Sequence, residues 1–388
     1  MSRLIVPALV AALVVGVAPA SASDDVGFDH VGEMARAGQW QLAAMRLPEA
    51  WRSSKGEGVV VAVLDTGVNG RHPDLRGAVI QGPDLTGAAK GLWGRHGTAM
   101  ASLIAGRGHG DERRGGVIGV APAAKVLSIR VTLENGDPLR VQQRSGGRDA
   151  LAKGIRYAVD HGADVISMSL GGGSGAWEGS ASEEEAVQYA IANGAVLVAS
   201  SGNDGETANR MNFPAAYPGV IAVGAVDKSL RVAGFSNRQD YLSVVAPGTE
   251  IVTADGDDSY VVSDGTSSAA AMVAGIAALI KAAHPDMSPY HVRMAIELGT
   301  RKRPADGHSP AYGHGVANAL LALREADRLD VPAPPPARPG PYFGDGPPPV
   351  SRWPVVAGMV MLVAAMSARV IVRHRKRRRR STKTTLPT

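Results

Sequence analysis

The 388-residue sequence contains no cysteine. Disulfides, thiolate metal ligands and a cysteine nucleophile are therefore excluded. No internal repeat is visible either. A chain without disulfides must be stabilised by its hydrophobic core, and the region of about 300 residues between the two chain ends is long enough to form one.

Acidic residues are missing from the C-terminal tail, residues 373–388, which holds eight Lys and Arg. The formal net charge of the whole chain is +5, and without this tail, Arg3 and Arg369 the remaining residues carry −5. The high isoelectric point therefore gives no reason to expect nucleic-acid binding. A basic block of this kind instead sets membrane topology and contacts anionic lipid.

The N-terminal segment 1–22 begins with a charged residue, continues as an apolar run and ends in small residues. This pattern is typical of a signal peptide, with cleavage after Ala22 or Ala20. Residues 23–39 then form a short N-terminal extension. We expect the protein to be exported.

The C-terminal part divides into three segments. Residues 329–353 are rich in proline and predict an extended linker. The apolar stretch 354–372 precedes the basic tail 373–388, an order that predicts one transmembrane helix with its C-terminus in the cytosol. The protein would then be a single-pass protein of the cell membrane. The alternative is an amphipathic or buried helix beside a solvated tail.

Between these ends, residues 40–328 alternate short β-branched runs with helix-compatible stretches that end in glycine. Apolar runs buried on both faces and separated by helices predict an α/β fold, with a mostly parallel sheet covered by helices on both faces. The expected strands are 58–65, 125–131, 163–170, 195–200 and 220–226, and the expected helices are 97–106, 147–162 and 183–194. Ligands of such sheets bind beyond the carboxyl ends of the strands.

Two polar residues fall at this edge of the predicted sheet. Asp65 ends the first strand in "VAVLDTGVNG", and His96 lies in "GRHGTAM" at the start of a helix. Because the positive end of a helix disfavours imidazolium, we expect His96 to be neutral near pH 7, as a general base must be. Taken singly, each residue is also compatible with an ordinary turn or surface loop.

The stretch "SDGTSSAAAMVAG" places Ser267 and Ser268 where an apolar helix begins. One of them is either a nucleophile or a simple N-cap. The free amide groups of the helix start can stabilise an oxyanion, and Asn203, just beyond another strand, offers a side-chain amide. On its own, Asn203 is equally a turn residue.

Together with "VISMSLGG", "SSGNDG", "FPAAYPGVIAVGA" and "YGHGVANAL", these motifs make Trp40–Leu323 closely resemble the subtilisin-like serine proteases, or subtilases. The resemblance implies a three-layer fold and a serine endopeptidase. It assigns Asp65 as the residue that orients the base, His96 as the base, Asn203 as the oxyanion donor and Ser267 as the nucleophile.

The resemblance also implies how an extended polypeptide substrate binds. Ser169, Leu170 and Gly171 match the segment whose backbone pairs with the substrate as an added strand. Asn212 matches a position at the base of the pocket for the P1 side chain, where a polar amide disfavours a large apolar residue. Ala271 departs from the family, which usually has proline there, and this bears on efficiency.

Three other features are assigned no chemistry. Ser268 lies where the family has Met or another side chain, so it is not the expected nucleophile. The acidic "DGDD" at 255–258 lacks the spacing of a calcium loop, so no cofactor is predicted, with an unsupported calcium site as the open alternative. His109, in the glycine-rich "GRGHGDERRGG", is predicted to be a solvated loop residue, and its loop lacks the Lys-Ser/Thr of a phosphate cradle.

The overall organisation resembles the mycosins, membrane-anchored subtilases of actinobacterial type VII secretion systems. A short N-terminal extension, a proline-rich linker, one C-terminal membrane helix and a short basic tail carry this resemblance. It implies an extracytoplasmic endopeptidase that processes an exported protein, with secretion-system membrane components as partners. The alternative is a structural subunit of a secretion complex with a vestigial site. The missing cysteines are a departure, since mycosins often have disulfides.

Overall fold

The computed structural model describes residues 24–87, 94–140, 149–171 and 179–330. The chain divides into two units, Met1–Pro341 and Tyr342–Thr388, and the second lies wholly outside the described residues. The expected signal peptide, membrane helix and basic tail also lie outside them.

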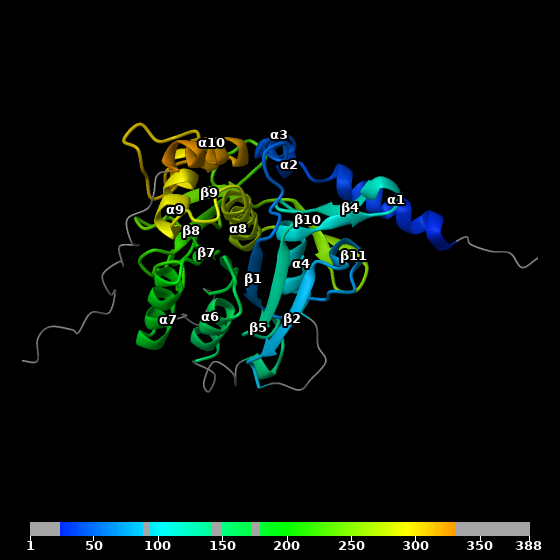
Figure 1. The fold of residues 1–388 in the computed structure, drawn as a ribbon, viewed down its shortest axis with the longest axis horizontal. Helices are drawn as coiled ribbons and strands as arrows, with labels where there is room; N and C mark the ends of the chain where they lie inside the picture. Colours follow the sequence, from blue (N-terminus) through cyan, green and yellow to red (C-terminus); the bar gives the residue numbers. More distant parts are fainter. Residues whose placement is uncertain (1–23, 88–93, 141–148, 172–178, 331–388) are drawn as a thin grey trace, which may run out of the picture. The chain divides into compact units, whose positions relative to one another are not determined.

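A nine-stranded sheet forms the centre of the first unit (Figure 1). Its strand order is β12-β13-β9-β8-β7-β6-β1-β5-β2, and every pairing is parallel except that of β12 with β13. The strands are β1 (Val60–Asp65), β2 (Val79–Asp84), β5 (Lys125–Arg130), β6 (Val165–Met168), β7 (Val196–Ser200), β8 (Ile221–Val226), β9 (Val244–Pro247), β12 (Thr300–Arg301) and β13 (Val316–Ala317). The expected strands are confirmed within a few residues at their ends.

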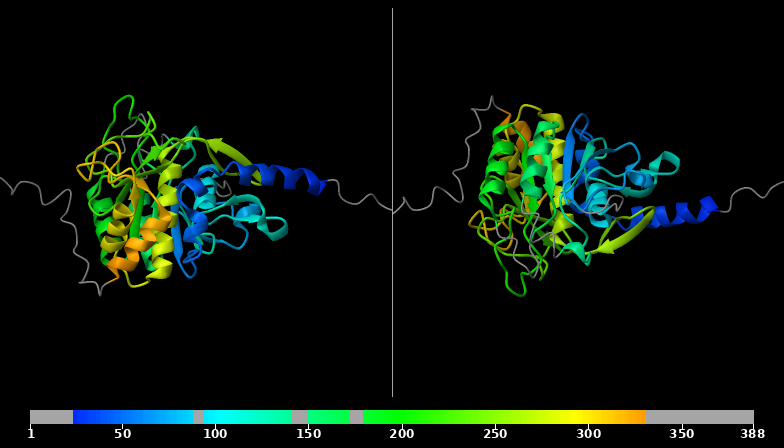
Figure 2. Two further views of the ribbon diagram at one scale, coloured as in Figure 1. Left: turned by 90° about the horizontal axis from the view of Figure 1, so that it is seen from above. Right: turned by 90° about the horizontal axis from the view of Figure 1, so that it is seen from below.

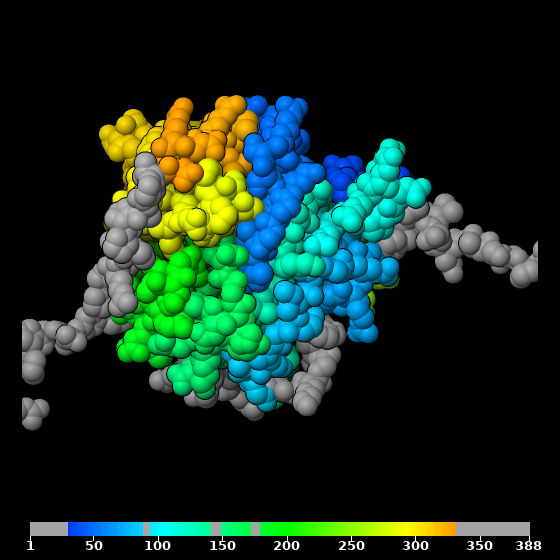
Figure 3. All heavy atoms as spheres, in the orientation of Figure 1, coloured from blue at the N-terminus to red at the C-terminus, as the bar shows by residue number. Residues whose placement is uncertain are grey.

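Helices cover both faces of the sheet, which makes three layers (Figure 2). One face packs against α4 (Arg95–Ala105), α8 (Thr266–Ala283), α9 (Pro289–Leu298) and α10 (Ala319–Leu329), and the other against α6 (Ala150–Asp160) and α7 (Ala181–Ala192). In the space-filling view α7 (green), α9 (yellow) and α10 (orange) form much of one side of the surface (Figure 3). The predicted three-layer α/β fold is confirmed.

Alternation along β1 shows why this sequence forms a doubly covered strand. Val61 and Val63 belong to the core on the α8 side, whereas Ala62 and Leu64 belong to the core on the α6 side. All four are at most 1% exposed. Successive side chains of a strand point to opposite faces, so a continuous apolar run fits only a strand buried on both.

Smaller elements surround the three layers. Their bounds are α1 (Asp24–Ala37), α2 (Gln41–Ala44), α3 (Leu47–Ala50), η1 (Pro73–Leu75), η2 (Asp111–Arg113) and the antiparallel hairpins β3 (Arg107–His109) with β4 (Gly115–Ile118) and β10 (Ile251–Asp255) with β11 (Ser259–Ser263). Helix α1 packs against β4, where Arg36 Nε donates to Gly116 O at 2.8 Å. The N-terminal extension is thus part of the described domain.

Among the described residues, one helix is long and apolar enough to cross a membrane, and it is α8. In this domain 83% of that stretch is buried, which identifies α8 as the central core helix. The helix begins with the Thr-Ser-Ser sequence at the edge of the sheet and runs from there through the core. The membrane helix predicted at 354–372 lies outside the described residues.

Candidate active site

Asp65 is the last residue of β1, and its side chain is 1% exposed. Its Oδ1 lies 2.7 Å from His96 Nδ1 and accepts a second hydrogen bond, also of 2.7 Å, from the Thr66 backbone N–H. Its Oδ2 is buried and has no hydrogen-bond partner among the described residues. The carboxylate therefore orients the imidazole ring of His96 through one oxygen, Oδ1.

His96 is the second residue of α4, and its side chain is 32% exposed. Burial lowers the pKa of His96, but the charge of Asp65, the hydrogen bond to it and the charge of Glu134 together raise that pKa above its ordinary value, against an opposing effect of Arg140. The expectation that the helix N-terminus leaves His96 with a lowered proton affinity is therefore wrong. The two nearby carboxylates outweigh the burial of the ring and the charge of Arg140.

Ser267 is the second residue of α8 and is half-buried, whereas Ser268 is 2% exposed. The Ser267 hydroxyl donates to Ser169 O at 3.4 Å, and Ser169 Oγ donates to Ser267 O at 2.9 Å. Within the described part of the chain, the hydrogen bond of this hydroxyl thus goes to Ser169 and not to His96. Helices α4 and α8 pack together and both begin at the carboxyl edge of the sheet, so His96 and Ser267 lie at the same edge.

Asn203 follows β7, and its side chain is fixed by the start of α8. Its Oδ1 accepts from the Thr266 backbone N–H at 2.9 Å and from Thr266 Oγ1 at 2.8 Å. The amide nitrogen is left to act as a donor. A Cβ placed on Gly265 would lie 3.8 Å from Asn203 Nδ2 and 3.7 Å from the Ser267 backbone N, so these two donors lie around the same point.

Ser169, Leu170 and Gly171 follow β6 directly, at the same edge of the sheet. Leu170 is buried, and Gly171 has a φ of 103°, a conformation that favours glycine. The backbone of this segment therefore lies beside Ser267, to which Ser169 is hydrogen-bonded.

Asn212 lies against Gly171, because a Cβ on that glycine would be 2.9 Å from Asn212 Oδ1. The residue is 2% exposed, and its Nδ2 donates to Ser200 O at 2.7 Å. Its Oδ1 has no hydrogen-bond partner within the described ranges. The structure thus brings Asn212 together with the segment that was expected to bind substrate.

Glu134 also belongs to this site, although no sequence motif points to it. Its Oε1 accepts from the His96 backbone N–H at 2.9 Å and from Thr66 Oγ1 at 2.8 Å. It lies in "VTLENGDP", just beyond β5, where an acidic residue is unremarkable. Only the pairing of β5 with β1 reveals that this loop meets the start of α4.

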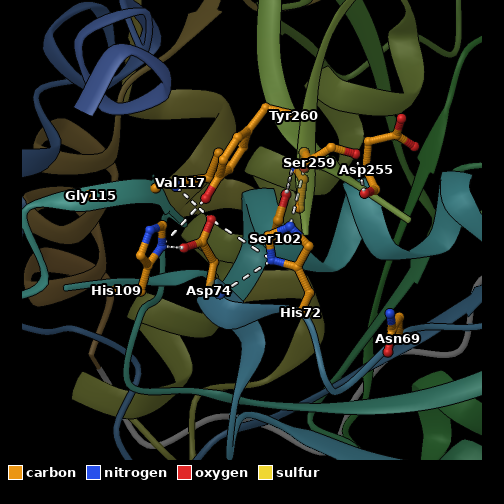
Figure 4. Close-up of polar contacts among 12 residues, drawn as sticks. Asn69, His72, Asp74, Ser102, His109, Gly115, Val117, Asp255, Ser259 and Tyr260 are labelled. Atoms are coloured by element: carbon orange, nitrogen blue, oxygen red, sulfur yellow. Dashed lines mark hydrogen bonds and ion pairs between the residues drawn. The ribbon is translucent and has the colours of Figure 1, made fainter. Parts of the chain in front are cut away.

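A second Asp–His pair is formed by Asp74 of η1 and His109 of β3 (Figure 4). His109 Nδ1 is 2.6 Å from Asp74 Oδ1, and the His109 side chain is only 12% exposed. Asp74 Oδ2 accepts from the Val117 N–H at 2.8 Å, and Tyr260 Oη lies 3.4 Å from His109 Nδ1. The prediction that His109 is a solvated loop residue is therefore wrong, because β3–β4 folds it onto a buried carboxylate.

The acidic 255–258 segment forms the tip of the β10–β11 hairpin. Asp255 pairs with Arg95, and Asp257 Oδ1 accepts from Asn69 Nδ2 at 3.2 Å. Within the described ranges, no group of three or more His, Asp or Glu side chains is arranged to hold a metal ion. These carboxylates serve contacts between the hairpin and neighbouring loops.

Comparisons with known proteins agree with this geometry. The sequence profile of the subtilase family matches residues 56–315, which include Asp65, His96, Asn203 and Ser267. Thermitase of Thermoactinomyces vulgaris is 36% identical over 288 residues, covering 74% of this chain and 96% of thermitase. Fervidolysin of Fervidobacterium pennivorans is 36% identical over 317 residues, covering 74% of this chain and 43% of fervidolysin. The structure of MycP1 from the ESX-1 type VII secretion system has a TM-score of 0.64 at 28% identity, covering 78% of this chain and 88% of that one.

Proposed function

Because the chain belongs to the subtilase family and is a subtilisin-like serine endopeptidase, we propose that Ser267 is its nucleophile, His96 its general base and Asp65 the residue that orients the base. The observation that carries this assignment is the 2.7 Å contact between buried Asp65 and partly exposed His96, beside the start of α8. Asp65 requires a proton on His96 Nδ1, which leaves Nε2 free to accept one.

In the first half-reaction, Ser267 Oγ forms a bond to the scissile carbonyl carbon and gives its proton to His96 Nε2. His96 then passes this proton to the leaving amine as the C–N bond breaks, and an acyl-enzyme remains. In the second half-reaction a water molecule attacks the acyl carbon and gives a proton to His96, which returns it to Ser267 Oγ. Asp65 stays ionised and stabilises the imidazolium at both transition states.

Before the attack, the Ser267 hydroxyl must turn from Ser169 O toward His96. Its present hydrogen bond is 3.4 Å long, at the weak end of the range, so little stabilisation is lost when it breaks. Rotation about χ1 moves the oxygen between staggered positions without moving the helix. The hydrogen bond that Ser169 Oγ donates to the Ser267 backbone oxygen holds Ser169–Gly171 beside the start of α8.

Asn203 Nδ2 and the Ser267 backbone N–H are the proposed donors to the oxyanion. Both lie around Gly265, and the position of Asn203 is set by its two bonds from Thr266. Donors that are already oriented stabilise the developing charge without reorganisation at the moment of reaction. The substrate itself would lie extended along Ser169–Gly171, with its P1 side chain directed toward Asn212.

For the cellular role we propose a membrane-anchored, extracytoplasmic endopeptidase that processes an exported protein. The signal-like segment 1–22, the apolar stretch 354–372 and the basic tail 373–388 support this placement. Similarity to MycP1, a protein described as part of a type VII secretion system, supports association with secretion-system membrane components. External protease added to intact cells should degrade the catalytic domain and leave the tail protected. Degradation of the tail in intact cells would contradict the topology.

A structural role in a secretion complex is the competing proposal, and the same similarity to MycP1 supports it. Ser267→Ala separates the two, since it removes one oxygen and leaves the fold intact. If the protein processes an exported substrate, the variant should abolish processing while the protein itself remains abundant. Processing that continues with Ser267→Ala would contradict the endopeptidase role, and loss of secretion only upon deletion of the whole chain would favour the structural one.

A further inference from the structure

The helix that carries His96 begins without a cap of its own. It starts after Gly94, which has no side chain to accept from the first N–H groups. In most helices a Ser, Thr, Asp or Asn at that position does so. A side chain has no room here, because a Cβ on Gly94 would collide with Thr66 Oγ1. The acceptors must therefore come from elsewhere in the chain.

Glu134 and Thr66 supply them. Glu134 Oε1 accepts from the His96 backbone N–H at 2.9 Å, and Thr66 Oγ1 accepts from the Gly97 N–H at 3.0 Å. The Thr66 hydroxyl in turn donates to the same Oε1 at 2.8 Å, and the Thr66 N–H donates to Asp65 Oδ1. One carboxylate oxygen thus joins the backbone of His96 to the residue next to Asp65.

The charges around the imidazole come from two segments. Asp65 lies at the end of β1, while Glu134 and Arg140 lie in the segment that follows β5. Asp65 and Glu134 favour the protonated ring, and Arg140, which donates to Leu133 O at 2.7 Å, opposes it. Glu134 therefore acts on the ring by charge and on the backbone by hydrogen bonding.

We propose that Glu134 is a positioning residue for catalysis: its carboxylate caps the helix that carries His96, fixes the backbone of that residue and stabilises the imidazolium formed during each half-reaction. The proposal rests on the role given above to His96. Glu134 does not contact the substrate or the reacting atoms, and it acts through His96 alone.

Glu134→Gln separates the charge from the hydrogen bonds, since Gln Oε1 can accept both while carrying no charge. Removing the negative charge lowers the pKa of His96, and a general base works when it is deprotonated. The acidic limb of the activity profile should therefore move to lower pH, by about 0.5 for a partly screened charge at this range. The plateau rate should fall by about threefold, because the same interaction no longer stabilises the imidazolium.

Glu134→Ala removes the acceptor as well as the charge. The N–H of His96 and the Thr66 hydroxyl lose their shared partner, so the start of the helix is no longer fixed beside Asp65. The turnover number should fall by about tenfold with little change in KM, since the substrate-binding segment Ser169–Gly171 is untouched. Glu134→Gln should lose much less turnover than Glu134→Ala, because it keeps the hydrogen-bond acceptor. The gap between the two variants measures the effect of the cap without that of the charge.

The test uses the full-length protein and a fluorophosphonate, whose reaction with Ser267 requires a deprotonated base but no particular substrate sequence. Its rate is measured against pH for the wild type, Glu134→Gln and the matched control Asp137→Asn. Asp137 lies in the same loop and loses the same charge, but its carboxylate accepts from Leu139 N at 2.9 Å within that loop.

We expect the Glu134→Gln profile to move to lower pH and the Asp137→Asn profile to coincide with that of the wild type. A Glu134→Gln profile that coincides with the wild type, or equal shifts in both variants, would overturn the proposal. If the wild-type protein were not labelled at Ser267 at all, the roles proposed for the triad would fail first, and this proposal with them.

Discussion

The domain contains two Asp–His pairs with almost the same internal geometry. His96 lies 2.7 Å from Asp65, and His109 lies 2.6 Å from Asp74. Both carboxylates are buried, at 1% and 0% exposure of the side chain. The distance and burial of the carboxylate therefore do not separate a catalytic pair from a structural one.

The surroundings do separate them. The His96 side chain is 32% exposed and lies where α8 begins, whereas that of His109 is 12% exposed and packs beside Tyr260. A Cβ on Gly32 of α1 would lie 2.8 Å from His109 Nε2, so the N-terminal helix closes this side. A polypeptide can reach the first imidazole but not the second.

The two carboxylates are also used differently. Asp65 Oδ2 has no hydrogen-bond partner among the described residues, while Asp74 Oδ2 accepts from the Val117 N–H at 2.8 Å. Asp74 thereby joins η1 to the β3–β4 hairpin. If the roles proposed above hold, an Asp–His pair becomes catalytic through its place at the sheet edge, where a helix start supplies a serine and backbone amides, and not through its own geometry.

Asparagine substitutions in the two pairs should have opposite consequences. We expect Asp65→Asn to lower the turnover number by about 10⁴, the size of effect known for this residue in serine proteases, because the wrong tautomer of His96 is favoured. Asp74→Asn should change turnover by less than about threefold. Turnover is measured on an unfolded, fluorescently labelled protein.

The same two variants should reverse their order in stability. Asp74→Asn breaks a buried pair and should lower the free energy of unfolding by about 3 kcal/mol, measured by urea denaturation. Asp65→Asn should lower it much less. A comparable loss of turnover in both variants would show that the second pair also supports catalysis.

The proposed oxyanion donor, Asn203, sharpens the comparison, because it is held at the start of α8, on the side of the first pair. Asn203→Leu keeps the volume of the side chain and removes the donor. We expect turnover to fall by about 10²–10³, as it does when subtilisin loses such a donor, with KM little changed. Steady-state kinetics give both numbers. A raised KM at constant turnover would instead make Asn203 a substrate-binding residue.

The smallest expected effect concerns pH. Burial lowers the pKa of His72, which lies beside Asp74, whereas the pKa of His96 is raised. A buried histidine with a lowered pKa contributes stability that is lost as pH falls below its unfolded value of about 6.5. His96 has the opposite sign, because its contribution is complete below that value and is lost as pH rises through its folded pKa.

Urea unfolding at pH 7.5 and 5 can detect this contribution. The difference in unfolding free energy between the wild type and His72→Asn should be smaller at pH 5 than at pH 7.5, because protonation of His72 opposes folding only at the lower pH. If this difference in unfolding free energy stayed constant or widened at pH 5, the folded protein would not oppose protonation of His72, and the prediction would be wrong.

Much of the fold was predictable because its signal is local. The runs that became β1, β5, β6, β7 and β8 are apolar and β-branched, and the helices between them end in glycine. Strands β2, β9, β12 and β13 and the two hairpins were not predicted. Their pairing depends on long-range contacts, and their sequences have no periodicity of their own.

The placement of Asp65, His96, Asn203 and Ser267 at one edge of the sheet was predictable, because each ends or follows an apolar strand or begins a helix. Their catalytic roles belong to the proposal. Glu134 and the environment of His109 were not predictable, because each depends on a loop folding onto an element that is distant in sequence. The expectation for the proton affinity of His96 was wrong because it considered the helix end alone. Asp65 is the larger of the two carboxylate influences that raise the pKa of His96, and Glu134 adds to it.

The most direct test of the central claim is the site of fluorophosphonate modification, mapped by mass spectrometry in the full-length protein. If the Asp65–His96 pair activates the serine at the start of α8, the phosphonyl group should be found on Ser267, and Ser267→Ala should remove it. Modification of Ser268, or labelling that survives Ser267→Ala, would contradict the account.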